Sequence, residues 1–272
     1  MTQHLVTLGI IGGGVMGEAL LSRILKNQTF PPQQVLVSAP QAARREQLQK
    51  TYDIQVTADN GTVIAKAEIV LLAIKPQVFN SVAKALPRPK KPSSQLILSI
   101  LAGTPLKRLE AAFPGQPIVR AMPNTPATVG LGMTAIAPGQ HSSAEHMQQA
   151  STIFEAVGEV VEVPEYQMDA VTGLSGSGPG YIAVMIEALT DGGVAAGLPR
   201  AIASKLALQT VRGTAELLYQ TGMHPAELKD RVTSPGGTTI AGISRLEESA
   251  VRSALIEAVR ASYRRSQELG QS

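Results

Sequence analysis

The chain has 272 residues, and its 24 lysines and arginines against 21 aspartates and glutamates give a formal net charge of +3. It contains no cysteine, which excludes disulfides, thiolate metal sites and cysteine nucleophiles. Its histidines show no HExxH spacing, so no metal site is predicted. No apolar run approaches the ~18 residues of a membrane span, and no basic block with interleaved aromatics indicates nucleic-acid binding. Because Met1–His4 lacks the charged start of a signal peptide, we expect a soluble, cytoplasmic protein.

Short β-rich runs alternate with helical segments over residues 1–163. The run Ile69–Ile74 is continuously apolar, which is typical of a parallel strand covered by helices on both faces. The predicted strands are Leu5–Ile11, Val35–Ser38, Ile54–Thr57, Ile69–Ala73, Gln95–Ile100 and Pro117–Met122. The predicted helices are Val15–Lys26, Ala42–Tyr52, Gly61–Ala67, Val78–Leu86 and Leu106–Ala112. This alternation predicts a doubly wound α/β domain with a parallel sheet.

Helical patterns dominate residues 164–272, which we expect to form a second, all-α domain. The predicted helices are Tyr181–Ala196, Ala201–Tyr219, Pro225–Val232, Thr239–Glu248 and Val251–Leu269. The stretch Tyr181–Leu189 is apolar on nearly every side, and a helix without a polar face is buried. Either the first domain or a second subunit covers it. So small a helical domain buries little surface alone, which favours a dimer.

The segment Gly12–Gly17 reads GxGxxG and lies between the first predicted strand and the first predicted helix. Its glycines permit a tight turn and close backbone approach, and the helix N-terminus offers N–H groups and partial positive charge to a pyrophosphate. A purely structural turn is the alternative interpretation. The strand–turn–helix context favours a dinucleotide site, and therefore a Rossmann-type domain.

The end of the second predicted strand bears on which dinucleotide is bound. An NAD site usually has a carboxylate there, whereas this chain has Ser38-Ala39-Pro40 followed by Arg44 and Arg45. A hydroxyl with nearby guanidinium groups suits a 2′-phosphate, which favours NADP(H) over NAD. The alternative is that the arginines only solvate a helix face. Asn60 is a candidate for an adenosine contact by position alone.

Two further strand ends place residues where ligands gather in such sheets. The fourth predicted strand ends in Ala73-Ile74-Lys75-Pro76, where Lys75 faces either bound charge or solvent. A later strand ends in Ala121–Pro126, where two prolines around Asn124 and Thr125 predict a rigid loop.

Two glycine-rich stretches interrupt the helical part, at Leu174–Gly180 and Val232–Thr239. Thr238 or Thr239 could cap the following helix. The run Ser234–Thr239 holds more than a cap needs, because its glycines bare N–H groups between hydroxyls, which suits a small carboxylate. The helical part offers no evident acid–base pair, since His224 is typical of a turn or cap. An imine fits such a site, because a protonated C=N accepts hydride with little more than positioning.

The chain resembles the pyrroline-5-carboxylate reductases over nearly its whole length, most specifically at Leu228–Ile240 and also at Leu174–Tyr181, Ala121–Pro126 and Ala73–Gln77. The resemblance implies reduction of the cyclic imine 1-pyrroline-5-carboxylate to L-proline, the last step of proline biosynthesis, with NADPH or sometimes NADH. It implies cofactor contacts from Ile11, Gly12, Gly13, Gly14, Val15, Met16, Ser38, Asn60, Ala73, Ile74, Lys75, Pro76, Ile100, Leu101 and Ala102.

The resemblance also implies a substrate site. Ser234, Gly237 and Thr238 would bind the substrate carboxylate, and the hydroxyl of Thr239 would approach the imine nitrogen as the catalytic group. Glu165 aligns with a substrate-site carboxylate of some members. The family further implies a dimer interwoven through the helical domain, commonly five dimers in a ring.

The chain departs from the family pattern in two places: Gly180 stands where alanine is usual, and Arg231 replaces an asparagine of some members. Two other functions compete with the reductase. A β-hydroxyacid dehydrogenase would carry a catalytic lysine early on the long helix, but Gly180–Leu189 contains none. A non-catalytic NADP-binding sensor would lack turnover with the imine.

Overall fold

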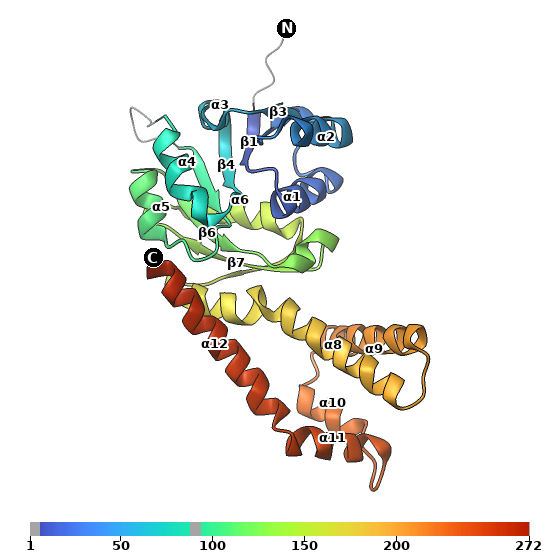
Figure 1. The fold of residues 1–272 in the computed structure, drawn as a ribbon. Helices are drawn as coiled ribbons and strands as arrows, with labels where there is room; N and C mark the ends of the chain where they lie inside the picture. The colour runs from blue at the N-terminus through green and yellow to red at the C-terminus, as the bar shows by residue number, and fades with distance from the viewer. Residues whose placement is uncertain (1–5, 88–93, 272) are drawn as a thin grey trace. The chain divides into compact units, whose positions relative to one another are not determined.

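The computed structural model describes residues 6–87 and 94–271, so the predicted first strand residue, Leu5, lies outside the described residues. The described strands form one eight-stranded sheet in the order β3-β2-β1-β4-β5-β6-β7-β8 (Figure 1). They are β1 (Val6–Ile11), β2 (Val35–Ser38), β3 (Gln55–Thr57), β4 (Ala67–Leu72), β5 (Leu96–Ser99), β6 (Ile118–Met122), β7 (Gly132–Pro138) and β8 (Gly158–Glu162). The six predicted strands are confirmed, with small shifts at their ends.

The strands from β3 to β6 are all parallel, as continuous apolar runs predict. In contrast, β7 pairs antiparallel with β6, and β8 pairs parallel with β7 at the edge of the sheet. The sequence pattern did not single out β7, β8 or the helix α6 (Ala144–Glu155) between them.

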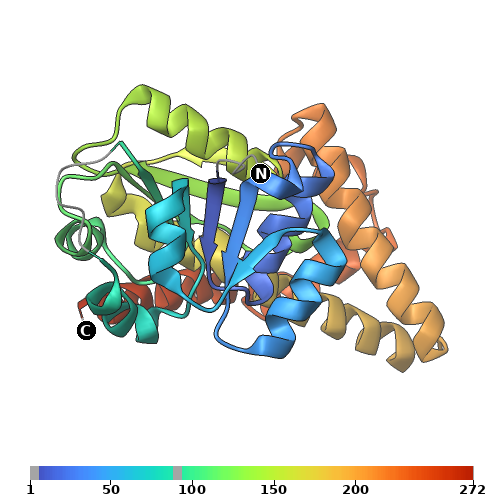
Figure 2. The ribbon, with the colours of Figure 1, turned by 90° about the horizontal axis from the view of Figure 1, so that it is seen from above.

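Helices cover both faces of the sheet, which confirms the doubly wound arrangement (Figure 2). On one face, α1 (Val15–Lys26), α2 (Ala42–Tyr52) and α6 bury Leu20, Leu48 and Phe154 against the strands. On the other face pack α3 (Asn60–Lys66), α4 (Phe79–Ala85) and α5 (Leu106–Ala112). Each fully buried large side chain contributes about 1.5–3 kcal/mol, so these contacts hold the ends of the strands in fixed positions.

Asp59 caps α3, whose first residue is the candidate site residue Asn60. Its carboxylate accepts hydrogen bonds from the side chain of Thr62 and from the backbone N–H of Gly61, and these lower the pKa of Asp59 below its ordinary value of 3.8. The carboxylate therefore contributes stability above that value and loses it as the pH falls through the lowered pKa.

We expect Asp59→Ala to lower Tm at neutral pH, with a difference from the native chain that shrinks as the pH falls below 3.8. Thermal unfolding across this range measures the effect, and Asp59→Asn, which keeps a capping oxygen without the charge, is the matched control. A Tm difference that does not change with pH would contradict the role of the charge.

The described residues divide into two compact units, and the division differs from the predicted boundary between residues 163 and 164. The first unit extends to Gly176 and also includes the chain from Ser262 onward. Residues beyond 163 join it because Met168 packs against Ala135 and Ala137 of the sheet, and because Ser266 donates a hydrogen bond to Asp169. This unit therefore also contains η4 (Glu165–Gln167), α7 (Met168–Val171) and the π-helical turn η5 (Thr172–Gly176).

The second unit, Ser177–Ala261, is helical, as the sequence predicts. Its helices are α8 (Gly178–Ala195), α9 (Arg200–Thr221), α10 (Pro225–Arg231), α11 (Thr238–Glu248) and the part of α12 (Val251–Gln271) before Ser262. Helix α8 packs on α9 at Thr190, Ala203 and Ala207, which are buried. No helix of the described residues combines the length and apolar character that crossing a membrane requires.

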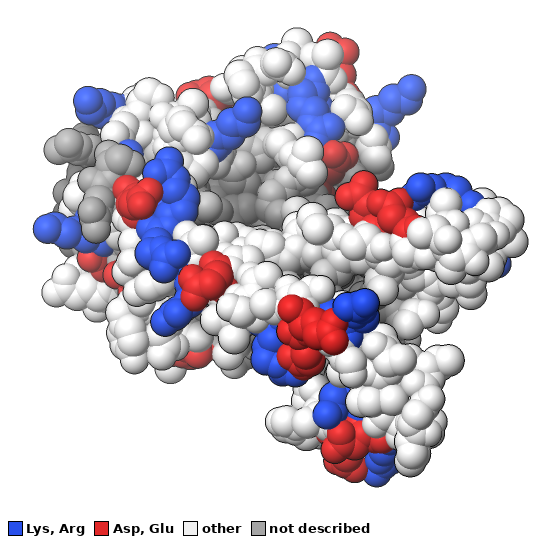
Figure 3. Space-filling model, turned by 60° about the horizontal axis from the view of Figure 1, so that its bottom comes forward, with Lys and Arg blue, Asp and Glu red and all other residues white. Residues whose placement is uncertain are grey.

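Within the second unit, the predicted burial of Tyr181–Leu189 is not achieved. Ile182, Val184 and Leu189 on α8 are exposed, and Val184 retains 65% of its accessible surface. Leu206 and Leu208 on α9 are also exposed. In Figure 3, charged side chains of both signs lie in mixed clusters rather than in a patch of one sign. Exposed apolar side chains on two adjacent helices are typical of a surface that a partner covers.

Candidate functional site

Most predicted cofactor residues meet at one edge of the sheet, because the carboxyl ends of parallel neighbouring strands end together. They are Ile11, Gly12, Gly13, Gly14, Val15 and Met16 at the end of β1, Ser38 at the end of β2, Ala73, Ile74, Lys75 and Pro76 after β4, and Ile100, Leu101 and Ala102 after β5. The edge also receives Asn60 at the start of α3 and Arg44 on α2.

The turn after β1 has a backbone that only glycine accommodates. Gly12 has a φ of +111°, and a Cβ there would lie 2.5 Å from the carbonyl oxygen of Ala73. A Cβ on Gly17 would lie 2.2 Å from the carbonyl oxygen of Gly12. The loop and the start of α1 therefore approach the neighbouring strand end more closely than side chains permit.

The N-terminus of α1 is open to an anion. Its N-cap residue, Gly14, makes no side-chain capping bond, and a Cβ on Gly14 would meet nothing within 4 Å. The first-turn N–H groups of an α-helix have no acceptor within the helix, and here they face open space beside the exposed Val15. This geometry fits a pyrophosphate at the helix N-terminus.

Ser38 and Asn60 are joined across β2 and α3. The Ser38 hydroxyl is buried and donates to the Asn60 carboxamide oxygen at 2.7 Å, with a longer contact of 3.4 Å to the Ile10 carbonyl. Each side chain thus holds the other in place at the rim, where the sequence predicts contacts with the adenosine half of a dinucleotide.

Arg44 and Arg45 take different partners. Arg44 donates to the Gly13 carbonyl and forms an ion pair with Glu18, whereas Arg45 donates to the carbonyls of Ala39 and Pro40. The sequence pattern did not identify Glu18. Its signal was a carboxylate in the first turn of the helix that opens at the glycine turn.

The segments after β4 and β5 are anchored by the backbone. Ala73 N–H donates to the Ile11 carbonyl, and Ile100 N–H donates to the Leu72 carbonyl. Lys75 is exposed at the start of η2 (Pro76–Val78). Leu101 is buried and Ala102 is exposed, so Ala102 presents its surface at the rim.

The loop Ser234–Thr239 belongs to the second compact unit. Gly236 has a φ of +69°, and Gly237, not a threonine, is the N-cap of α11 and makes no side-chain capping bond. Within the described residues, the hydroxyls of Ser234, Thr238 and Thr239 have no hydrogen-bond partner. The hydroxyls are exposed beside the N–H groups of an uncapped helix, and the predicted binding of a small carboxylate at this loop stays a prediction. His224, by contrast, caps α10, as predicted.

Glu165 is engaged within the first unit. Its Oε1 accepts hydrogen bonds from the Leu106 N–H at the start of α5 and from Arg120 at 3.2 Å. Arg120 is buried on β6, so the ion pair stabilises the junction of β6, α5 and η4. The substrate contact implied for Glu165 stays a prediction. Arg120 was not singled out from the sequence.

Asn124 explains why the loop after β6 is held firmly. It is buried, its side-chain nitrogen donates to the Ser175 carbonyl, and its oxygen accepts from the Met133 N–H. The loop is therefore tied to both β7 and the turn η5.

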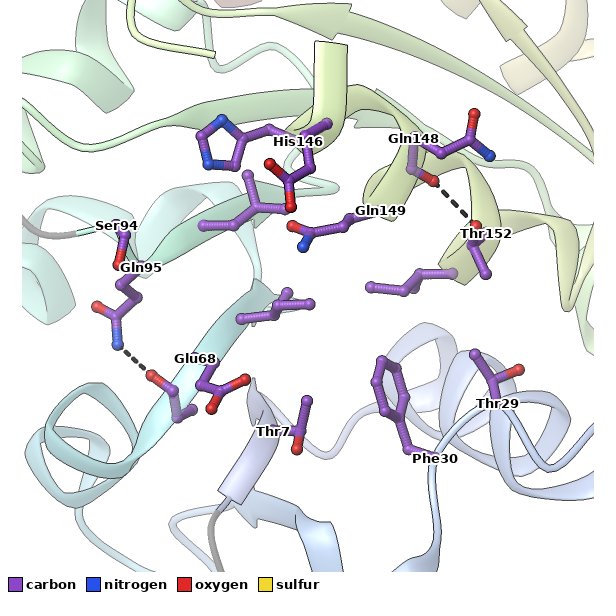
Figure 4. Close-up of a pocket in the computed structure, with 15 residues that line it drawn as sticks. Thr7, Thr29, Phe30, Glu68, Ser94, Gln95, His146, Gln148, Gln149 and Thr152 are labelled. Carbon is purple, nitrogen blue, oxygen red and sulfur yellow. Dashed lines mark hydrogen bonds between the residues drawn. The ribbon is translucent and has the colours of Figure 1, made fainter. Parts of the chain in front are cut away.

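A cavity of about 760 Å³ lies at the amino ends of the strands, on the side of the sheet opposite to the predicted cofactor residues (Figure 4). Thr7, Glu68 and Gln95, near the amino ends of β1, β4 and β5, line it together with Gln149 and Thr152 of α6. None of the described residues that line this cavity is a predicted site residue. Among the described residues, no three histidine or acidic side chains cluster in a way that could hold a metal ion.

Comparisons with known proteins agree over nearly the whole chain. A family model for pyrroline-5-carboxylate reductase dimerisation matches residues 165–269, and one for NADP oxidoreductases, coenzyme F420-dependent, matches residues 7–103. A pyrroline-5-carboxylate reductase of Synechocystis is 59% identical over 97% of this chain and 98% of its own.

Solved structures give the same result. A pyrroline-5-carboxylate reductase from Coxiella burnetii is 31% identical, with a TM-score of 0.92 over 99% of this chain and 100% of its own. The Plasmodium falciparum pyrroline carboxylate reductase, solved with NADP bound, is 30% identical, with a TM-score of 0.87 over 97% of this chain and 98% of its own. The fold, the glycine turn at the carboxyl edge of the sheet and these full-length similarities together show that the chain belongs to the pyrroline-5-carboxylate reductase family.

Proposed function

We propose that this chain is a pyrroline-5-carboxylate reductase that converts the cyclic imine 1-pyrroline-5-carboxylate to L-proline, the final step of proline biosynthesis. The observation that carries the proposal is the 59% identity to such a reductase along nearly the full length of both chains. Residues 1–163 are assigned to nicotinamide dinucleotide binding, and residues 164–272 to substrate binding and dimerisation.

The described residues fit a nicotinamide dinucleotide, with NADPH as the preferred form and NADH as the alternative. The open N-terminus of α1 and the space beside Gly14 support binding of the pyrophosphate. Ser38 and Asn60 would contact the adenosine half, and the segments 73–76 and 100–102 after the neighbouring strands would line the rest of the cofactor. When bound, the reduced nicotinamide supplies the hydride.

The loop before α11 is assigned to the substrate. Ser234, Gly237 and Thr238 bind its carboxylate through hydroxyl and N–H donors, and the arrangement at the uncapped helix supports this role. The Thr239 hydroxyl would hydrogen-bond to the imine nitrogen and orient it. Because a protonated imine is already electrophilic, positioning replaces an acid–base pair.

Assembly and location complete the proposal. The chain acts as a homodimer interwoven through its helical domain, with five dimers forming a decamer, in the cytoplasm. The exposed apolar side chains of α8 and α9, with the matching dimerisation family model, support the dimer. A stable dimer interface typically buries such a surface.

The direct test is turnover. Purified chain with NADPH and 1-pyrroline-5-carboxylate is expected to consume NADPH and form proline in equal amounts, more efficiently than with NADH. Reactions lacking the imine are the control. Absence of NADPH consumption with the imine present, from a folded chain that binds NADPH, would reject the reductase and favour a nucleotide sensor.

A further inference from the structure

We propose that Glu18 is a specificity-determining residue. Glu18 neutralises Arg44, so that Arg44 holds the glycine turn in place instead of binding the 2′-phosphate of NADPH. Arg45 is then the cation that distinguishes NADPH from NADH. The inference deepens the proposed function, because it rests on nicotinamide dinucleotide binding at the carboxyl edge of the sheet.

Arg44 is committed to protein groups. Its Nε donates to the Gly13 carbonyl at 2.7 Å, one terminal nitrogen donates to Glu18 Oε2 at 2.6 Å, and the other donates to Gln47 at 2.9 Å. The side chains of Arg44 and Glu18 keep only 22% and 28% of their accessible surface. Partial burial strengthens this ion pair relative to a fully exposed one. The ion pair also orients the guanidinium toward the glycine turn.

Among the described residues, Glu18 forms an ion pair with no cation besides Arg44. Its second oxygen, Oε1, accepts the Tyr52 hydroxyl at 3.1 Å. Burial of the phenol and then the charge of Glu18 raise the pKa of Tyr52, so the hydroxyl remains a donor. Both carboxylate oxygens are thus fixed, one on Arg44 and one on Tyr52.

Because of the position of Glu18, its ion pair with Arg44 is needed for an anion to bind at the N-terminus of α1. Glu18 lies in the first turn of α1, the helix whose N-terminus is open to a pyrophosphate. An uncompensated carboxylate there would repel either dinucleotide, because both carry the pyrophosphate. Arg44 cancels that charge, which leaves it little net charge to offer a 2′-phosphate.

Arg45, unlike Arg44, is not neutralised by a carboxylate among the described residues. One terminal nitrogen donates to the carbonyls of Ala39 and Pro40, both at 2.8 Å, and within the described residues no carboxylate lies within ion-pair distance of it. The guanidinium therefore lies, without a neutralising carboxylate, at the two residues that follow β2. A ribose 2′-phosphate at the end of this strand would meet Arg45 as an unneutralised partner.

Calorimetric binding of NADPH and of NADH to the full chain tests the inference. Arg45→Gln is expected to lower the affinity for NADPH about tenfold or more and to leave the affinity for NADH nearly unchanged. Arg44→Gln is expected to lower the affinity for both nucleotides alike. The substitution removes the hydrogen bond to the glycine turn and leaves the charge of Glu18 uncompensated. Glu18→Gln should raise the affinity for NADPH relative to NADH, because it frees the charge of Arg44.

A double variant provides the decisive comparison. Glu18→Gln combined with Arg44→Gln should bind NADH more tightly than Arg44→Gln alone, since the unmasked charge is gone. Lys50→Gln, which removes an exposed cation from the same helix, is the matched control for net charge and should change neither affinity. Thermal unfolding confirms that each variant is folded.

Three outcomes would overturn the inference: a selective loss of NADPH in Arg44→Gln, no selective loss in Arg45→Gln, or no recovery in the double variant. Binding needs no imine, so a chain that binds both nucleotides without reducing the imine loses the proposed function but leaves this test intact. A native chain that binds neither nucleotide overturns both.

Discussion

Gly12→Ala is expected to disrupt the glycine turn and abolish dinucleotide binding. The new Cβ would lie 2.5 Å from the carbonyl oxygen and 2.7 Å from the carbonyl carbon of Ala73, and the φ of +111° disfavours any side chain. Ala73 cannot retreat, because its N–H donates to Ile11, and Gly12 N–H is itself bonded to the Ser38 carbonyl. We expect a loss of about 3 kcal/mol in unfolding free energy from overpacking and backbone strain together.

The measurements are thermal unfolding and calorimetric binding of NADPH. The expected loss corresponds to a Tm lower by about 10 °C. Gly14→Ala is the control in the same turn, since its Cβ meets nothing within 4 Å and its φ is −76°. It should keep the native Tm, although a methyl group in the space for the phosphates weakens binding. If Gly12→Ala kept both Tm and affinity, the close approach of the turn to Ala73 would not matter.

Local signals were sufficient to predict the first six strands and the helices between them. A parallel strand buried on both faces must be continuously apolar, and β4 and β5 show this plainly. The region after β6 carried weaker signals. β7 begins with a glycine, ends with a proline and contains Met, Thr, Ala and Ile between them, and β8 is a partly exposed edge strand with glutamates at two positions. Their pairing is set by contact between Gly132 and Gly158, which no local pattern reveals.

The missed helix α6 did carry a readable signal. Ser143 and His146 form a capping box, and the buried residues Met147, Ala150 and Phe154 follow at helical spacing. The signal is weak because the capping box usually has Glu or Gln, and here has histidine, at its third helical position.

The candidate site was predictable where chain order alone brings residues together. The carboxyl ends of β1, β2, β4 and β5 lie at one edge of any sheet of this topology, so strand order alone predicts that the residues after them lie together. The hydrogen-bond and ion-pair partners of individual side chains could not be predicted in this way. Arg44 pairs with Glu18 rather than solvent because α1 and α2 pack on the same face of the sheet, a contact between residues far apart in sequence. The contact of Glu165 with Arg120 and α5 has the same origin.

The helical part illustrates a different limit. Its composition indicates apolar helices that need covering, and the second unit by itself leaves Val184 and Leu189 exposed. Sequence hydrophobicity records the burial required in the functional assembly, and it does not say which molecule provides it.

Thr239→Ala is expected to reduce kcat for imine reduction by about 10- to 100-fold, the value of one hydrogen bond to a charged group in the transition state. Thr239 lies in the first turn of α11, is exposed and has no hydrogen-bond partner among the described residues, so its hydroxyl does no structural work there. The Tm should therefore stay at the native value. The affinity for NADPH should also be unchanged, because the dinucleotide is assigned to the glycine turn and the strand ends.

Steady-state kinetics with NADPH and 1-pyrroline-5-carboxylate, together with direct NADPH binding, separate these effects. Thr239→Ser, which keeps the hydroxyl, should recover most of the lost kcat, whereas Thr239→Val, which keeps the shape, should not. Ser234→Ala is the informative neighbour: it removes a donor assigned to the substrate carboxylate and should raise KM more than it lowers kcat. Equal losses of turnover and NADPH binding in Thr239→Ala would instead mean that the residue only shapes the loop, and the assignment of its hydroxyl to the imine nitrogen would fail.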